Sequence, residues 1–135
     1  MDFKLIPSTC SYCGTGCGVL FQVMDGRLID TLPMKTHPVN EGKLCIKGWN
    51  LHEHVISDKR LKSPMIKKDG ELQESSWDEA IRVTADKFKS IINEHGPDSV
   101  GVLASAKITN EENYLAQKFP RAVIGTNNVD HCARL

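Results

Sequence analysis

The spacing of apolar positions changes character about halfway along the chain. In the first part, apolar residues occur in short runs rich in β-branched and aromatic side chains, and the clearest runs are Val19–Met24 and Arg27–Leu32. Asp25 and Gly26 lie between them, a dipeptide that favours the two-residue turn of a β-hairpin. The segment from Pro33 to Gly48 is rich in turn-forming residues. We therefore expect a small region of short strands and turns.

The second part follows the helical period instead. Ser76 and Glu79 have the spacing of a capping box, and Gly96 with Pro97 supplies a stop signal. The residues between these signals place one apolar stripe along a helix: Ile81, Thr84, Ala85, Phe88, Ile91 and Ile92. This pattern predicts a single amphipathic helix.

A strand and a second helix are expected after this helix. The continuous apolar run from Ser99 to Ala104 predicts a buried strand that pairs in parallel. A helix is expected to begin after Thr109 or Asn110 and to kink or stop near Pro120. The segment from 123 to 130 suggests a short strand or a turn. Helix, strand and helix in succession form the opening of an α/β layer domain.

A more polar connector, Leu51–Gly70, separates the two patterns. We place the boundary there, with a β-rich domain at residues 1–60 and the incomplete N-terminal part of an α/β domain at residues 61–135. The fold class expected is therefore α+β passing into α/β.

The composition excludes several partners. The 135 residues include 17 basic and 17 acidic residues, so no net charge is available to attract nucleic acid or an anionic membrane. No apolar stretch is long enough to span a membrane, and the first residues lack a secretory signal. We expect a cytoplasmic protein whose thiols stay reduced.

Four cysteines carry the strongest chemical signal. Cys10, Cys13, Cys17 and Cys45 form the pattern C-x2-C-x3-C-x27-C, and glycines lie between and beside them. Thiolates converging in this way are typical of an iron-sulfur cluster, with the glycines allowing close approach of the backbone. A structural zinc site would more often show two C-x2-C knuckles or a Cys/His pair, and a disulfide framework is the third alternative. The spacing also differs from that of bacterial ferredoxins.

The other candidate ligands do not join this pattern. Cys132 is expected to be a small buried hydrophobe. Four histidines show no ligand spacing and are interpreted as structural or solvent-facing: His37, His52, His54 and His95. His131 is the one histidine that we expect near an active site.

Six segments carry a family resemblance: Cys10–Gly18, Leu44–Gly48, Leu61–Ile66, Ser76–Ala80, Asn110–Tyr114 and Ile124–Arg134. Together they resemble the N-terminal part of a molybdopterin-dependent formate dehydrogenase catalytic subunit. The resemblance covers nearly the whole chain, and the segment from Ile124 to Arg134 is the most specific to the formate dehydrogenase branch.

The resemblance implies the cofactors and their contacts. It implies a [4Fe-4S] cluster on the four cysteines and a bis-molybdopterin guanine dinucleotide that carries molybdenum or tungsten. Lys47 would lie between cluster and pterin as an electron relay, although an isolated lysine is usually a solvated surface residue. The remaining cofactor-binding candidates are Ser105, Lys107, Asn128 and Asp130. Some family members have arginine at the position of Ala106, which leaves the neighbouring contact open, and the Asn-Asn-Val-Asp segment is also ordinary turn chemistry.

The resemblance also implies a larger enzyme. In the family the metal ligand, cysteine or selenocysteine, directly follows the segment that here ends at Leu135, so we expect a reading frame interrupted at a selenocysteine codon. Formate and carbon dioxide would be the substrates, and ferredoxin-like iron-sulfur subunits, in some assemblies with a hydrogenase, would be the partners. The alternatives are a stand-alone iron-sulfur electron-transfer or scaffold protein and a zinc-stabilised interaction module. A nitrate reductase or a respiratory-complex subunit is a further alternative within the family.

Overall fold

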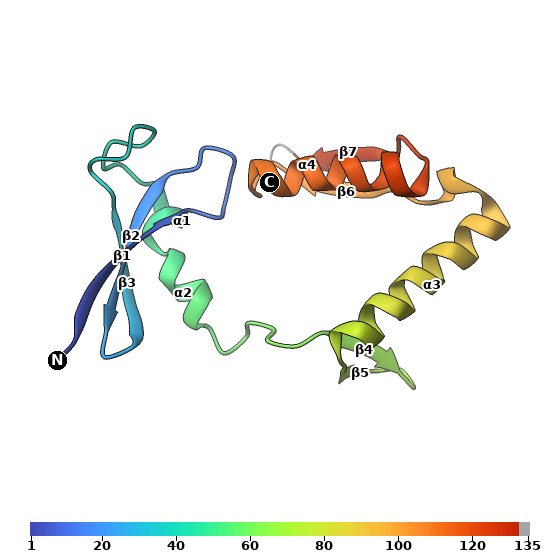
Figure 1. The fold of residues 1–135 in the computed structure, drawn as a ribbon, viewed down its shortest axis with the longest axis horizontal. Coiled ribbons are helices and arrows are strands. Elements are labelled where there is room, and N and C mark those ends of the chain that lie inside the picture. Colours follow the sequence, from blue (N-terminus) through green and yellow to red (C-terminus); the bar gives the residue numbers. More distant parts are fainter. Residues whose placement is uncertain (133–135) are drawn as a thin grey trace. The chain divides into compact units, whose positions relative to one another are not determined.

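The computed structural model describes residues 1–132 and divides the chain into two compact units (Figure 1). The first unit comprises Met1–Arg60, Ser105–Asn113 and, among the described residues after Asp130, His131 and Cys132. The second comprises Leu61–Ala104 and Tyr114–Asp130. The unit that contains the cysteines therefore also includes a short segment from the later part of the chain.

The first unit is built on an antiparallel three-stranded sheet. Strands β1 (Phe3–Thr9), β2 (Gly18–Met24) and β3 (Arg27–Pro33) pair in the order β1-β2-β3. Asp25 and Gly26 both have positive φ, 48° and 78°, as a primed hairpin turn requires, so the predicted hairpin is confirmed. Strand β1 was not predicted, because its proline interrupts the strand pattern; an edge strand tolerates proline since one side of it forms no ladder.

Two short helices follow the sheet, α1 (Ile46–Trp49) and α2 (Leu51–Ile56). The predicted connector was wrong over its first residues, which form α2. Leu51 is only 2% exposed and packs with Cys10 and Val19 in the core of this unit. Tertiary burial of this leucine stabilises a helix too short for its sequence pattern to predict.

The second unit begins with a hairpin of β4 (Met65–Lys68) and β5 (Glu71–Glu74). Its turn residues Asp69 and Gly70 have φ of 52° and 90°. The later part of the predicted connector was therefore also wrong. The Asp-Gly dipeptide carried the same hairpin signal here as at residues 25 and 26, although the flanking runs are short and polar.

The long helix α3 (Trp77–His95) confirms the predicted amphipathic helix. The Ser76 hydroxyl accepts a hydrogen bond from the Glu79 backbone N–H at 3.2 Å, as an N-cap should. The Glu79 carboxylate instead accepts from Lys68 Nζ at 2.9 Å and Ser75 Oγ at 2.7 Å. The N-cap was thus predicted correctly, and the acidic partner joins the helix to the β4–β5 hairpin.

Strands β6 (Val102–Ser105) and β7 (Val129–Cys132) form a two-stranded sheet. The Val102 N–H donates to the Asn128 carbonyl and the Ala106 N–H to the Cys132 carbonyl, so both strands advance in the same direction, as predicted. Residues Pro97–Ser99 form a 3-10 helix. The strand begins later than expected and is not buried: Leu103 is 87% exposed, because no second layer covers it within residues 1–132.

Helix α4 (Asn110–Phe119) is followed by a π-helical turn, Pro120–Ile124. The regular α-helix therefore ends at Phe119, and the stop predicted near Pro120 is confirmed, because proline lacks the N–H that would continue the α-helical ladder. Gly125 then takes the left-handed conformation with φ of 89°. Within the part of the chain that the structure describes, no helix has the length and apolarity that crossing a membrane requires.

Candidate cluster and cofactor site

The four predicted ligands line one cavity of about 260 Å³. Cys10 follows β1, Cys13 and Cys17 lie on the loop between β1 and β2, and Cys45 is the N-cap residue of α1. The other residues that line the cavity are Tyr12, Leu44, Ile46, Lys47 and Gly48. The fold therefore brings together four thiols that are separated by up to 35 positions in the sequence.

Hydrogen bonds of the backbone hold the first three thiols on a closed loop. The Cys10 N–H donates to the Cys17 carbonyl at 2.8 Å, and the Gly16 N–H to the Cys13 carbonyl at 3.4 Å. Gly16 has φ of 66°, a conformation that favours glycine. The tight return of the chain between Cys13 and Cys17 therefore depends on a glycine at this position.

The thiols interact electrostatically with one another and with nearby donors. The Thr15 hydroxyl, 3.3 Å from the Cys13 sulfur, is the largest influence that lowers the pKa of Cys13, and Lys47 also lowers it. Burial raises the pKa of Cys17, and the charges of Cys10, Cys13 and Cys45 raise it further. Four neighbouring thiolates repel each other. A positively charged iron-sulfur core bound between them would offset this repulsion.

The donor set fits an iron-sulfur cluster. The four cysteines that line the cavity are free thiols. Among residues 1–132, no three His, Cys, Asp or Glu side chains converge closely enough to hold a single metal ion. A tetrahedral zinc ion needs its four sulfurs within about 2.3 Å of one centre, whereas each thiolate of a [4Fe-4S] cluster binds a different iron, which spaces the thiolates more widely. Four soft thiol ligands around one cavity provide the donor set that such a cluster needs.

Lys47 lies on α1, two residues after Cys45, and lines the cysteine cavity. Its ammonium nitrogen is 5.8 Å from the ring centroid of Tyr12, within reach of a cation–π contact. The Tyr12 ring in turn meets His54 edge to face, with the centroids 6.1 Å apart. The lysine is thus held beside the cavity by an aromatic residue that sequence reasoning did not single out.

Ser105 and Lys107 lie at the carboxyl end of β6. The Ser105 hydroxyl accepts a hydrogen bond from the Lys107 N–H at 3.0 Å, and Lys107 is exposed. The neighbouring Asn110 side chain donates to the Gly14 carbonyl at 3.0 Å. Asn110 therefore joins this segment to the cysteine loop, a role that its sequence position, at the start of a helix, did not indicate.

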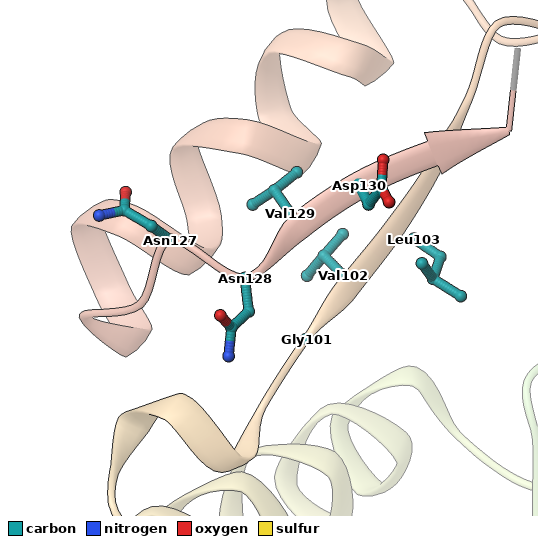
Figure 2. A pocket seen from close by; sticks show the side chains of 7 residues that line it. All are labelled: Gly101, Val102, Leu103, Asn127, Asn128, Val129 and Asp130. Carbon is teal, nitrogen blue, oxygen red and sulfur yellow. The ribbon is translucent and has the colours of Figure 1, made fainter.

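Asn128 and Asp130 line a second, open cavity of about 570 Å³ at the start of strands β6 and β7 (Figure 2). Figure 2 shows Val102 and Val129 on the two neighbouring strands, with Asn127 and Asn128 on the segment that leads into β7. The Asn128 amide donates to the Asp98 carbonyl at 2.8 Å. This amide group therefore holds the β7 segment against the turn before β6, as the turn-and-packing interpretation expects.

Two C-terminal expectations have different outcomes. Cys132 is exposed, so the prediction of a buried cysteine was wrong; β7 exposes most of its side chains within the described residues. The expected metal ligand, which the resemblance places directly after Leu135, lies outside the residues that the structure describes.

Comparison with known proteins decides the family. A family profile described as molybdopterin oxidoreductase Fe4S4 domain matches residues 3–57, and one described as molybdopterin oxidoreductase matches residues 60–135. The chain belongs to the molybdopterin oxidoreductase family. Its fold class is confirmed: a β-rich Fe4S4 region followed by the start of the molybdopterin domain. A [4Fe-4S] cluster and a molybdopterin cofactor are the groups that these two domains hold.

Relatives within the family include formate dehydrogenases. The chain is 56% identical over its whole length to the F420-dependent formate dehydrogenase 1 subunit alpha of Methanococcus maripaludis, and 46% identical to the F420-dependent formate dehydrogenase subunit alpha of Methanocaldococcus jannaschii. It spans 19% of the length of each of these relatives. Among solved structures, the acetylene hydratase of Pelobacter acetylenicus matches 93% of this chain and 18% of its own, with a TM-score of 0.70 and 27% identity.

Proposed function

We propose that these residues form the N-terminal part of a formate dehydrogenase catalytic subunit, which interconverts formate with carbon dioxide, a proton and two electrons. The observation that carries the proposal is the 46–56% identity, over 99–100% of the chain, to alpha subunits of formate dehydrogenases. The 27% identity to a hydratase is much lower, although the fold is shared. Fold alone does not decide between these reactions, so the degree of sequence identity is the better guide.

In this proposal the first domain covers residues 1–60 and binds the cluster. Supporting this boundary, the two profile matches meet between residues 57 and 60. Cys10, Cys13, Cys17 and Cys45 would ligate the cluster, since all four line one cavity. When bound, the cluster supplies a one-electron relay and the pterin-held metal supplies the site of two-electron chemistry. Lys47 would place a fixed positive charge beside the anionic cluster, favouring added negative charge there.

The second domain, residues 61–135, would begin the pterin site. Ser105 and Lys107 are the proposed contacts of the nucleotide arm, because they follow the carboxyl end of β6, where open α/β sheets place ligands. Asn128 and Asp130 are proposed as further contacts. The cofactor would be a bis-molybdopterin guanine dinucleotide with molybdenum or tungsten, and we propose selenocysteine as the ligand of this metal. Ferredoxin-like iron-sulfur subunits, with a hydrogenase in some assemblies, would accept the electrons in the cytoplasm.

The test is formate-dependent reduction of a viologen dye by the complete subunit, purified without oxygen, with acid-labile iron and sulfide measured in parallel. The wild-type subunit should reduce the dye with formate and should show the electron paramagnetic resonance signal of a reduced [4Fe-4S] cluster. Cys45→Ala should lose that signal. Cys132→Ala, a substitution of the one cysteine that does not line the cavity, is the matched control and should keep it.

Each other outcome contradicts a different part of the proposal. Hydration of acetylene without formate-dependent dye reduction would favour a hydratase. Bound zinc without sulfide would instead indicate a structural metal and no redox role for this region. An unchanged cluster signal in Cys45→Ala would remove Cys45 from the ligand set.

A further inference from the structure

The fourth ligand of the proposed cluster comes from a distant part of the chain. Cys45 follows Cys17 by 28 positions, and the segment between them includes β2, β3 and a long turn-rich loop. The first three cysteines are held together by their own loop, through the hydrogen bond from the Cys10 N–H to the Cys17 carbonyl. Other contacts must therefore position Cys45 relative to this loop.

Asn40 makes the connection. Asn40 is 7% exposed, and its side chain forms three hydrogen bonds with the backbone. Its Oδ1 atom accepts from the Gly18 N–H at 2.8 Å, and its Nδ2 atom donates to the Gly18 carbonyl at 3.1 Å. The same Nδ2 atom donates to the Lys43 carbonyl at 2.9 Å. Gly18 directly follows Cys17, and Lys43 precedes Cys45 by two residues.

The backbone around Asn40 is arranged to present this amide. The Lys43 N–H donates to the Asn40 carbonyl at 2.7 Å, which closes a tight turn. Glu41 and Gly42, the central residues of the turn, both have positive φ, 46° and 78°, so the turn is of the primed type. The side chain and the main chain of Asn40 thus both bind the backbone of Lys43. They thereby fix the segment that leads into Cys45.

The loop that carries Asn40 also packs closely against Gly18. A Cβ atom at Gly18 would collide with the ring of His37, and the Gly18 carbonyl also accepts from the Met34 N–H at 3.1 Å. The loop that carries Asn40 is therefore pressed directly against the residue after Cys17. One buried carboxamide therefore links the residue after Cys17 with the segment that leads into Cys45.

We propose that Asn40 is a positioning residue of the cluster, which fixes Cys45 relative to Cys17 and thereby influences the stability and electronic state of the cluster. This inference rests on the proposed function, because it assumes that these thiols bind a [4Fe-4S] cluster. Outer-shell residues that orient ligands affect metal sites through ligand geometry, without touching the metal. Asn40 acts in this way on two ligand-bearing segments at once.

The experiment compares Asn40→Asp with wild type in the complete, anaerobically purified subunit. Aspartate has nearly the same shape and can still accept from the Gly18 N–H, but it loses both donated hydrogen bonds. We expect the variant to lose its cluster to an iron chelator about 10-fold faster than wild type, on the scale of outer-shell effects at metal sites. We also expect shifted g-values of the reduced cluster, which a loss of fold stability alone would leave unchanged.

Asn50→Asp is the matched control. Asn50 also donates from its side chain to a backbone carbonyl, that of Ile46 at 2.7 Å, but this bond lies within a single helical turn and joins no two ligand segments. Its cluster lifetime and g-values should equal those of wild type. Equal values for Asn40→Asp, wild type and the control would overturn the inference.

A second variant keeps the test decisive if Asn40→Asp fails to fold. Asn40→Gln retains the carboxamide but displaces it by one methylene, so donors and acceptor remain available at a wrong distance. A folded Asn40→Gln subunit with altered g-values supports the inference, and one with a wild-type spectrum contradicts it. If the wild-type subunit itself contains no [4Fe-4S] cluster, the proposed function fails, and this result is distinct from failure of the Asn40 inference.

Discussion

At the scale of single residues, Lys47 is the cation for which we propose an effect on electron transfer. It lines the cysteine cavity and lies over the Tyr12 ring. Lys47→Gln removes the charge while keeping most of the side chain. We expect the rate at which formate reduces the cluster to fall about 10-fold or more with cluster content unchanged, on the scale of effects from residues that surround metal ligands. Stopped-flow reduction of the cluster by formate measures this rate.

Lys43→Gln is the control for the loss of a lysine. Lys43 is exposed and precedes Lys47 by four positions, but it does not line the cavity. Its substitution should leave the rate of cluster reduction unchanged. A rate of cluster reduction in Lys47→Gln equal to that in Lys43→Gln and in wild type would show that Lys47 is an ordinary surface lysine.

Glu79 should make the stability of the second unit depend on pH. Its hydrogen bond from Lys68, followed by that from Ser75, lowers the pKa of Glu79 below the ordinary value of 4.5. Because the folded state favours the ionised carboxylate, Glu79 stabilises the fold above pH 4.5 and loses this effect as the pH falls through the lower, folded pKa. Hydrogen exchange in peptides from residues 77–95, corrected for intrinsic rates, should show α3 opening more readily on acidification.

Glu79→Gln should remove this pH-dependent part of the protection. Asp86→Asn, on the same helix, controls for the loss of a carboxylate and should keep the wild-type pH profile. If Glu79→Gln keeps the wild-type profile as well, the carboxylate has no stabilising partner in solution.

The residues of the site were predictable from the sequence to very different degrees. The four cysteines were recognisable because three of them fall within eight positions and thiolates have specific chemistry. Asn40 was not, because its hydrogen bonds to Gly18 join residues 22 positions apart and an asparagine in a turn-rich segment is unremarkable in sequence. Tyr12 and Asn110 escaped notice for the same reason: their contacts depend on the fold.

At the scale of elements, Ser76 sets the beginning of α3. Its hydroxyl satisfies the Glu79 N–H, one of the donors that a helix start leaves without an intrahelical partner. Ser76→Ala should lower the free energy of opening of the first turns of α3 by about 1 kcal/mol. Hydrogen exchange of the peptide that covers the first turns of α3 measures the change.

Ser90→Ala is the matched control for α3. Ser90 is exposed in the interior of the same helix, where alanine has the higher helix propensity. Protection should therefore stay the same or increase slightly. A loss of protection in this control as large as that in Ser76→Ala would mean that the cap is not the cause.

Elements were predictable where local signals and tertiary packing agree. Helix α3 has a capping residue, an apolar stripe and a glycine stop, and all three agree with the structure. The β4–β5 hairpin was missed although its Asp69-Gly70 turn is the same signal as Asp25-Gly26, because its strands lack an apolar face. Helix α2 was missed because one buried leucine, Leu51, stabilises it, and no periodic pattern extends over so few residues.

At the scale of the whole molecule, the described residues bury little of their apolar surface. The buried hydrophobic residues among them are Cys10, Val19, Leu51, Val100 and Ile124. On α3, Trp77 is 69% and Ile81 60% exposed, and both line an apolar cavity of about 300 Å³ together with Phe88 and Phe119. A chain that spans 19% of the length of its relatives leaves room for further segments to cover this face.

Ile81→Gln should therefore have opposite effects in two contexts. In isolated residues 1–135 it removes exposed apolar surface, so self-association measured by light scattering should decrease. In the complete subunit, where we expect Ile81 to be buried, the same substitution should cost about 1–3 kcal/mol of stability, because it replaces a buried alkyl group by a desolvated amide. Arg82→Gln, its neighbour on α3, controls for a change at the helix surface and should be close to neutral in stability. A neutral Ile81→Gln in the complete subunit would show that this face stays open to solvent there.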